Sequence, residues 1–364
     1  MKLLLVRLRQ IGDVVFTTPT FAALAERFPS AQLTYVVEPA AAAVVQGNPH
    51  LAHVVVAPRR PGVAGLRADV SLGLRLRRER FDVAIDFHGG PRASMLTWLS
   101  GATRRIGYEI AGRSWVYTDR VARPRELRAR HSVVNQWDLL APLGVAPPDR
   151  TKYPVAMPVD AQVRASVLAR LTAHRVPLDE LLVVMHVSAG NPFRRWPIAA
   201  FAEVAASLAS GASRALVIVT SGPSEADAAA HVIDAARSQL AESDRERILT
   251  CGEFSLSELR ALLDSAAVYI GGDSGPMHIA ATSRVPMVSL YGPTLPARSE
   301  PWRSPDIASA AVEVHGLPCR PCDQRVCLPG DFRCLGRITP RDVVQAAERL
   351  LEGGASRTRP EQLR

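Results

Sequence analysis

Short apolar runs of strand type alternate with helical stretches along most of this chain, and that alternation leaves few folds open. Parallel sheets covered by helices on both faces are built in this way. Two separate series of runs predict two doubly wound α/β domains. The runs lie at residues 2–8, 33–38, 54–57 and 82–87, and again at 181–187, 215–220, 248–251, 268–270 and 287–291.

A proline-rich, polar stretch over residues 142–158 separates the two series, and a helical stretch follows at 161–173. We expect a first domain over residues 1–160 and a second over 175–338. Residues 339–352 are expected to form a C-terminal helix, because apolar side chains recur there at helical spacing. The last residues, 353–364, are short of apolar side chains and are expected to be disordered.

The composition is that of a globular protein, with 364 residues of which 47% are hydrophobic and 22% charged. A formal net charge of +9 favours acidic partners such as phosphates, nucleic acid or an anionic membrane surface, without choosing among them. No apolar run approaches the roughly 20 residues that span a bilayer, and the first residues show no signal-peptide pattern. We therefore expect a cytosolic protein.

Residues 268–283 read as a buried strand, a glycine turn and the start of a helix. Glycines at such a turn let the backbone approach a ligand, and free N–H groups at a helix start favour a pyrophosphate. Asp273 and Ser274 are therefore candidates for a phosphate-binding loop with Gly275, although both residue types also serve as simple N-caps. His278 adds a titratable donor one turn on, with a buried core histidine as the alternative.

Polar residues follow three other predicted strands, at the sheet edge where open α/β sheets bind ligands. Gly12 and Asp13 follow the first strand, and Asp13 is either a functional acid or an N-cap. Arg194 and Arg195 follow the strand at 181–187, where arginines can neutralise a diphosphate. Glu225 follows the strand at 215–220 and can accept two ribose hydroxyls. Trp196, by contrast, is expected to be a packing anchor.

Four of the five cysteines gather late in the chain with the spacing C-x2-C-x4-C-x6-C. This spacing permits a four-thiolate site for structural zinc or, less readily, an iron–sulfur cluster. A plain loop of reduced thiols is the alternative, because a zinc ribbon has two C-x2-C knuckles and this segment has one. The four are Cys319, Cys322, Cys327 and Cys334.

Five motifs in this order resemble glycosyltransferase family 9, the ADP-heptose:lipopolysaccharide heptosyltransferases, over residues 1 to about 351. Any one of them alone is a weak signal. The motifs are Ile11-Gly12-Asp13, Arg194-Arg195-Trp196-Pro197, Gly222 to Glu225, Asp273 to His278, and Tyr291-Gly292-Pro293-Thr294. The cysteine segment also looks like one found in the branch that adds the second or later heptoses.

The resemblance implies a GT-B architecture, in which two Rossmann-like domains face each other across a cleft. It also implies an inverting reaction that needs no metal cofactor, with the acceptor on the first domain and the donor on the second. Asp13 matches the family's general base. Arg194, in a position usually held by lysine, matches the diphosphate contact, and Glu225 matches the ribose-binding acid. Asp273, Ser274, Gly275 and His278 match the donor loop.

Basic residues in the first half resemble the acceptor side, where phosphorylated inner-core sugars of lipopolysaccharide would be held. They are Arg92, Arg104 and Arg105, and a solvated charged surface is the alternative for each. His131 is a weaker candidate of the same kind. Membrane contact is expected to be peripheral and electrostatic, at the cytoplasmic face of the inner membrane, since no amphipathic anchor stands out.

Other functions remain as alternatives. A family member could use another nucleotide-sugar or acceptor, or could be a non-catalytic glycan-binding protein with the same fold, although Asp13 argues for catalysis. Nucleic-acid binding is suggested by the charge alone, since no recognition helix or zinc finger is found. A nicotinamide enzyme or an epimerase would require a glycine fingerprint that the sequence does not contain.

Overall fold

The computed structural model describes residues 1–123, 130–177, 179–187 and 189–355. The chain forms two compact units. Unit 1 comprises Met1–Pro158 with Trp302–Ser304, and unit 2 comprises Val159–Pro301 and the chain from Pro305 on. No described helix is long and apolar enough to cross a membrane.

Unit 1 is built on a parallel sheet of six strands in the order β3-β2-β1-β4-β5-β6. This is the strand order of a Rossmann fold, and it reverses between β1 and β4. The strands are β1 (Lys2–Val6), β2 (Gln32–Val37), β3 (His53–Val56), β4 (Val83–Asp86), β5 (Arg104–Tyr108) and β6 (Asp119–Val121).

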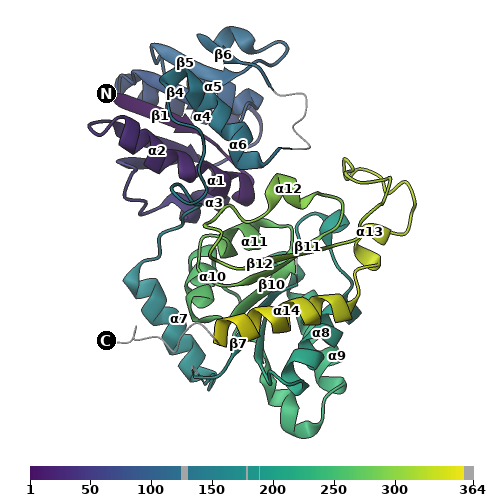
Figure 1. Ribbon diagram of the computed structural model, residues 1–364. Coiled ribbons are helices and arrows are strands. Elements are labelled where there is room, and N and C mark those ends of the chain that lie inside the picture. Colours follow the sequence, from purple (N-terminus) through teal and green to yellow (C-terminus); the bar gives the residue numbers. More distant parts are fainter. Residues whose placement is uncertain (124–129, 178, 188, 356–364) are drawn as a thin grey trace. The chain divides into compact units, whose positions relative to one another are not determined.

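The helices of unit 1 cover the sheet, and three of them begin at a proline, whose missing N–H costs nothing at a helix start. Figure 1 shows them around β1 and β4. They are α1 (Ile11–Thr17), α2 (Pro19–Arg27), α3 (Pro39–Val45), α4 (Gly62–Arg78), α5 (Pro91–Leu99) and α6 (Ser132–Trp137), with the 3-10 helices η1 (Ser114–Val116) and η2 (Asp138–Leu143).

Unit 2 repeats the same plan. Its parallel six-stranded sheet has the order β12-β11-β10-β7-β8-β9, which reverses between β7 and β10. The strands are β7 (Leu182–His186), β8 (Leu216–Thr220), β9 (Ile248–Leu249), β10 (Val268–Gly272), β11 (Met287–Tyr291) and β12 (Ser309–Glu313).

Helices again cover the second sheet, and α14 contacts β10, β11 and β12 (Figure 1). A capping box at Ser255 and Glu258 opens α10. The helices are α7 (Ala161–Ala173), α8 (Ile198–Ser210), α9 (Ala226–Ser238), α10 (Leu256–Leu262), α11 (Gly275–Ala280), α12 (Pro296–Ser299), α13 (Arg333–Gly336) and α14 (Pro340–Ala355), with the 3-10 helices η3 (Pro192–Arg194), η4 (Pro223–Glu225), η5 (Glu242–Arg247) and η6 (Leu263–Ser265).

The structure differs from the sequence prediction at several elements. Strands β5, β6 and β12 were not expected, because each is short and carries charged or small residues in place of an apolar run. The helix after β10 covers Gly275–Ala280, whereas helix was expected at 277–283. Helix α14 continues to Ala355, into the range expected to be a tail, and the rest of that range, 356–364, lies outside the described residues.

Trp302–Ser304 return to unit 1 in the middle of unit 2's sequence. The Trp302 indole is buried, its Nε1 donates to the Tyr153 carbonyl oxygen at 2.9 Å, and its ring lies 4.8 Å from that of His131. His131, considered for the acceptor side, is thus buried against an aromatic side chain and also caps α6.

Candidate functional site

The carboxyl edge of the first sheet places Asp13 beside Arg7, where the strand order reverses. Asp13 lies in the first turn of α1, whose N-cap is Gln10, so it is not the N-cap residue. Its carboxylate forms an ion pair with Arg7, whose guanidinium also donates to the Phe87 carbonyl oxygen at 2.5 Å. The Asp13 side chain keeps 35% of its surface exposed, against 13% for Arg7. Arg7 thus holds an accessible carboxylate in place.

His88 reaches the same edge from the end of β4, on a turn that buried Asp86 holds. The Asp86 carboxylate accepts hydrogen bonds from the backbone N–H groups of His88 and Gly89, at 2.9 and 2.8 Å. It also accepts one from the Tyr117 hydroxyl at 2.7 Å. Burial raises the pKa of Asp86, and these donors partly offset the effect. Burial, with the positive charge of Arg7, lowers the pKa of His88 to about 4, so the imidazole is neutral at pH 7.

Arg92 takes part in a network that holds unit 1 together. Its guanidinium pairs with Asp69 on α4 and with Glu38 after β2, each at 2.7 Å, and also donates to the Ala57 carbonyl oxygen at 3.2 Å. Only 17% of its side chain is exposed. These contacts occupy the donors that were expected to bind an acceptor.

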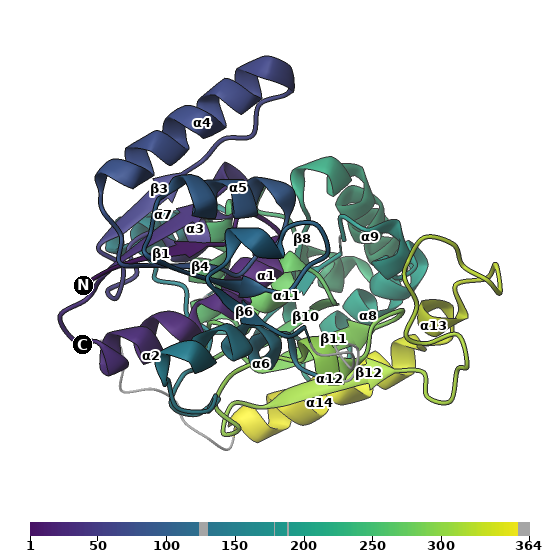
Figure 2. The same ribbon diagram turned by 90° about the horizontal axis from the view of Figure 1, so that it is seen from above.

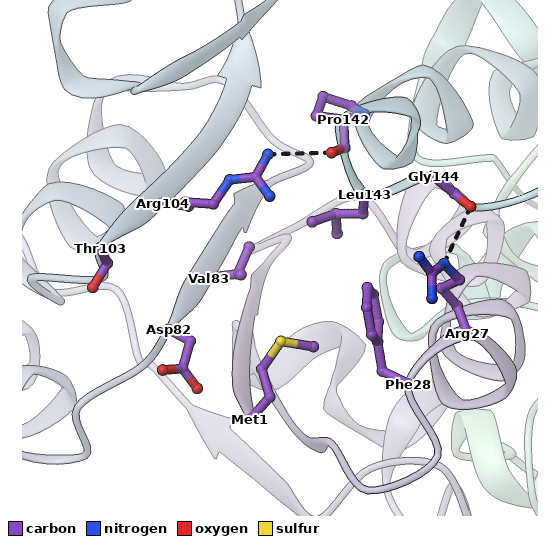
Figure 3. Close-up of a pocket in the computed structure, with 10 residues that line it drawn as sticks. All are labelled: Met1, Arg27, Phe28, Asp82, Val83, Thr103, Arg104, Pro142, Leu143 and Gly144. Atoms are coloured by element: carbon purple, nitrogen blue, oxygen red, sulfur yellow. Dashed lines mark hydrogen bonds between the residues drawn. The ribbon is translucent and has the colours of Figure 1, made fainter.

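Arg104 and Arg105 begin β5, so they lie at the amino edge of the sheet, opposite Asp13. Arg104 pairs with Asp119 at 2.6 Å and donates to the Pro142 carbonyl oxygen at 3.2 Å (Figure 3). Arg105 donates to the carbonyl oxygens of Val116 and Ala102. These two arginines, expected on the acceptor side, thus lie at the start of a parallel strand, whereas Asp13 lies beyond the carboxyl end of β1, at the other edge of the sheet.

Arg104 lines an open hollow of about 920 Å³ at that amino edge, with Met1, Arg27 and Phe28 among the other lining residues (Figure 3). Ligands of open α/β sheets bind at the carboxyl ends of the strands, the opposite edge. We therefore take the carboxyl edge with Asp13, and not this hollow, as the candidate ligand site of unit 1.

In unit 2, Arg194 is fixed at the carboxyl edge by two neighbouring segments. Its Nε donates to Gln324 Oε1 at 2.7 Å, and its Nη1 donates to the Asp273 carbonyl oxygen at 3.0 Å. Gln324 Oε1 also accepts from Asn191 Nδ2 at 2.8 Å. Asn191 caps the η3 turn that carries Arg194. The guanidinium is therefore held at the point where the strand order reverses.

Asp273 is a buried acid with several donors around it. His278 Nε2 lies 3.5 Å from one carboxylate oxygen, while Arg194 Nη1 and Thr294 Oγ1 lie 3.4 and 2.5 Å from the other. Burial opposes ionisation, but the hydrogen bond from His278, the charge of Arg194 and the Thr294 hydroxyl lower the Asp273 pKa to about 2. Asp273 is therefore ionised at pH 7 and acts as an anchor rather than as a helix cap.

The start of α11 shows whether Ser274 acts as a simple N-cap. Ser274 occupies the N-cap position, yet its side chain makes no capping hydrogen bond. Its Oγ is buried and has no hydrogen-bond partner among the described residues. A Cβ at Gly272 would lie 3.3 Å from the Arg194 carbonyl oxygen, so the glycine lets the β10 end and the η3 turn approach. The loop thus carries a hydroxyl that the described residues leave unpaired, next in sequence to Asp273, whose carbonyl oxygen accepts from Arg194.

Glu225 ends η4, after β8, and is 9% exposed. Arg195 pairs with it at 2.9 Å and also donates to the Ala189 carbonyl oxygen. Trp196 is buried as expected, and its indole donates to the Ile338 carbonyl oxygen. The two adjacent arginines therefore have different neighbours, since Arg194 contacts Asp273 and Arg195 contacts Glu225.

The metal site that the cysteine spacing permits is not formed among the described residues. All four thiols are free, and nowhere in the described ranges do three or more His, Cys, Asp or Glu side chains gather to hold a metal ion. Neither zinc nor an iron–sulfur cluster fits the residues as they stand. Instead, Arg320 joins the segment to β12 through Glu313 at 2.7 Å, and Phe332 lies 5.4 Å from the Phe193 ring. Burial is the main cause of a raised pKa at Cys334.

Comparison with known proteins identifies the family. The sequence model of glycosyltransferase family 9 (heptosyltransferase) matches residues 70–330. The chain belongs to glycosyltransferase family 9. This membership confirms the resemblance read from the five motifs and assigns the chain to a family of glycosyl-transferring enzymes.

Family 9 relatives match nearly the whole chain. Lipopolysaccharide heptosyltransferase 3 of Escherichia coli is 25% identical over 367 residues, covering 95% of this chain and 98% of the relative. Lipooligosaccharide heptosyltransferase 2 of Haemophilus ducreyi is 24% identical, covering 96% and 99%.

Solved structures of family 9 share the fold. A family 9 glycosyltransferase from Veillonella parvula aligns with a TM-score of 0.82 at 22% identity, covering 97% of each chain. The ADP-heptose lipopolysaccharide heptosyltransferase II of Escherichia coli aligns with a TM-score of 0.77 at 17% identity, covering 98% of this chain and all of that one. The expected α/β fold of the GT-B class is confirmed.

Four residues at the two edges were not singled out from the sequence: Arg7, His88, Thr294 and Gln324. Arg7 and His88 follow strands far apart in the sequence, and only the pairing of β1 with β4 brings them together. Thr294 ends a quoted motif, and its contact with Asp273 depends on the pairing of β10 with β11. Gln324 is 130 residues from Arg194 along the chain, and no local pattern signals that contact.

Proposed function

We propose that this protein is an inverting glycosyltransferase that moves a heptose from ADP-heptose to the inner core of lipopolysaccharide, with Asp13 as the general base. Family membership and the names of the relatives support the donor and acceptor classes. The observation that carries the proposal is that each sheet has an acid paired with an arginine at its carboxyl edge, where the strand order reverses: Asp13 with Arg7, and Asp273 with Arg194. Open α/β sheets bind ligands at that place.

In unit 1, the proposed chemistry begins with an acceptor hydroxyl. Its oxygen attacks the anomeric carbon of the heptose, and the Asp13 carboxylate takes the hydroxyl proton. The bond between that carbon and the β-phosphate oxygen breaks, so ADP leaves with the bonding electrons and the anomeric configuration inverts. Arg7 keeps the carboxylate oriented through their ion pair. General-base catalysis of this kind contributes a factor of about 10² to 10⁴ in rate.

In unit 2, the proposed donor site stabilises the charge that develops on ADP. Arg194 presents a guanidinium that Gln324 and Asp273 hold in position. Ser274 Oγ and the backbone of Gly275 would supply further donors to the diphosphate, while Glu225 would accept the ribose hydroxyls. A fixed cation can neutralise a leaving diphosphate, so the proposed reaction does not require a metal cofactor. His278 orients Asp273 in this scheme.

The acceptor in this proposal is a glycolipid at the cytoplasmic face of the inner membrane, so the enzyme would contact the membrane peripherally. The carboxyl edge of the first sheet supplies the basic side chains for its phosphorylated sugars. Arg9 is exposed there, and Arg113 donates to the Gly89 carbonyl oxygen at 3.1 Å. These two residues replace Arg104 and Arg105 in the proposed acceptor site.

The test is mass-spectrometric detection of a heptose added to a truncated inner-core acceptor by purified protein and ADP-heptose. A mass increase of one heptose with the wild-type protein is the expected result. Absence of transfer by folded protein that still binds ADP would overturn the donor and acceptor assignment. Other ADP-sugars and acceptors, or a non-catalytic glycan-binding role, would then be tested with the same protein.

A further inference from the structure

Helix α4 of unit 1 has an apolar outer face that the sequence interpretation did not find. Val63, Leu66, Val70 and Leu74 follow one another at spacings of three and four residues, which places them on one side of a helix. Their exposed fractions are 67%, 56%, 37% and 48%. The expectation that no amphipathic anchor stands out is therefore corrected. We call these four residues with Arg67, Arg75 and Arg78 the α4 outer face.

The opposite side of α4 packs against the rest of unit 1. Leu72 and Leu76 are buried in the core of unit 1, and Gly73 lies directly against α5. A Cβ at Gly73 would come within 2.5 Å of the Leu99 Cβ. Figure 2 shows α4 as a long helix at the margin of unit 1, beyond α5 and β3. The exposure of its outer side is thus a consequence of how α4 packs and not of a loose attachment.

The charge around α4 is strongly positive. From residue 59 to residue 80 the chain carries arginine at 59, 60, 67, 75, 77, 78 and 80, and only two acids, Asp69 and Glu79. Asp69 turns inward to Arg92 and Glu79 pairs with Lys2. Within the described ranges, Arg67, Arg75 and Arg78 form no ion pair, and they line a shallow hollow of about 500 Å³ together with the four apolar residues.

We infer that the α4 outer face docks on an anionic phospholipid bilayer, with the apolar residues at the level of the acyl-chain boundary and the arginines against the lipid phosphates. Helices that lie in the membrane surface combine an apolar stripe with a basic polar face in this way. A second copy of the chain is disfavoured as the occupant, because two such faces would bring their arginines together. This inference deepens the proposed function by naming the surface that would bring the enzyme to a glycolipid.

The test is flotation of the full-length protein with vesicles of phosphatidylethanolamine and phosphatidylglycerol, compared with vesicles of phosphatidylcholine alone. No acceptor or donor is present, so the result does not depend on the proposed reaction. We expect binding to the anionic vesicles and little to the neutral ones, weakened by salt. Replacing Arg67, Arg75 and Arg78 with Gln should weaken binding about 100-fold, since each cationic side chain near such a surface contributes about fivefold.

A matched pair of variants tests the apolar contribution. Leu74→Gln should weaken vesicle binding about tenfold, since it removes apolar area that would leave water. Leu168→Gln on α7 is the control, because Leu168 is exposed to a similar extent, 42%, and also lies on a helix between arginines. Circular dichroism checks that both variants are folded.

Three results would overturn the inference. One is equal binding of the wild-type protein to neutral and anionic vesicles, or none to either. Another is equal loss of binding for Leu74→Gln and Leu168→Gln. The third is a wild-type dimer in light scattering that Leu74→Gln dissociates, which would make the α4 outer face an interface between copies. Transfer activity on a soluble acceptor should be unchanged in Leu74→Gln, so failure here is distinguishable from failure of the proposed function.

Discussion

At the scale of single residues, the candidate site consists of charged side chains that their neighbours hold in position. Arg7 holds Asp13, and Arg194, His278 and Thr294 keep Asp273 ionised. Two histidines are uncharged instead, since burial lowers the pKa of both His88 and His186 to about 4. Each unit therefore combines a fixed acid with a neutral imidazole at neutral pH, and three of these groups lead to separate tests.

Asp13→Asn should abolish transfer while leaving donor binding intact. The amide cannot take the acceptor proton, so we expect the rate to fall by about 10³-fold, within the range of general-base effects. ADP binding, measured by calorimetry, should change by less than about twofold, because Asp13 belongs to unit 1 and the proposed donor site to unit 2. Asp82→Asn, at the amino edge of the same sheet, is the control and should keep its activity. Equal loss of transfer and ADP binding in Asp13→Asn would mark the residue as structural.

His186 should make unit 2 less stable in mild acid. It is buried at the end of β7, and its Nδ1 lies 3.0 Å from Thr220 Oγ1. The folded pKa of about 4 is below the unfolded value of about 6.5, so the unfolded chain binds the proton first as pH falls. Stability from this group is complete above pH 6.5 and is lost between 6.5 and 4. Between pH 7.5 and 5.5, the free energy of unfolding measured in urea should fall by about 1 kcal/mol more for wild type than for His186→Gln. An equal fall in both proteins would contradict this assignment.

Asp273 makes unit 2 less stable in acid in the same direction as His186, but at lower pH. Its folded pKa of about 2 is below the ordinary value of 3.8, so its contribution to stability is present above about pH 4 and is lost as pH falls toward 2. Asp273→Asn should therefore destabilise unit 2 at pH 7 by about 2 kcal/mol or more, because it leaves Arg194 and His278 without their carboxylate. The difference between wild type and variant in urea unfolding should shrink at pH 3. A constant difference from pH 7 to 3 would mean that Asp273 acts by packing alone.

At the scale of elements, the sequence predicts the buried strands well and the charged ones poorly. The run at 287–291 coincides with β11, and the helix at 161–173 coincides with α7, because long apolar or periodic segments carry their own signal. β5 begins with Arg104 and Arg105, and only pairing with β4 makes it a strand. Because β5 was not expected as a strand, the sequence could not show that these two arginines lie at the amino edge of the sheet. Local pattern thus indicates which residues are polar, and pairing decides where they lie.

The cysteine segment illustrates a further limit, because its role comes from a contact far away in the sequence. Gln324 accepts from both Asn191 and Arg194, so the segment positions the proposed diphosphate contact. Gln324→Leu should raise the KM for ADP-heptose about tenfold and lower kcat less, since a hydrogen bond to a charged group is worth about 1.5–3 kcal/mol. Gln239→Leu at the end of α9 is the control. An unchanged KM in Gln324→Leu would reduce the contact to a packing role.

At the scale of the whole molecule, the two units share one strand plan and are joined by more than one segment of chain. After β11 and the segment that carries Thr294, the chain returns to unit 1 at Trp302 before entering β12. The sequence gives no sign of this return, because Pro301 and Trp302 stand in a short polar stretch without periodicity. A boundary drawn at one point along the chain therefore misses three residues of unit 1.

The return of the chain predicts that one tryptophan in unit 2's stretch of sequence stabilises unit 1. Trp302 is buried against His131, and its backbone oxygen accepts from the Val155 N–H at 3.0 Å. Trp302→Ala should lower the free energy of unfolding by about 3–5 kcal/mol, as is usual when a buried aromatic side chain is replaced by alanine. Hydrogen–deuterium exchange should then rise in the peptides around Tyr153 and His131. Trp196→Ala is the matched variant, since Trp196 is equally buried but contacts Phe201 and Ile338, so exchange should rise in α8 instead. If both variants raised exchange equally in both units, the units would unfold as one cooperative body and the return segment would not belong to unit 1 alone.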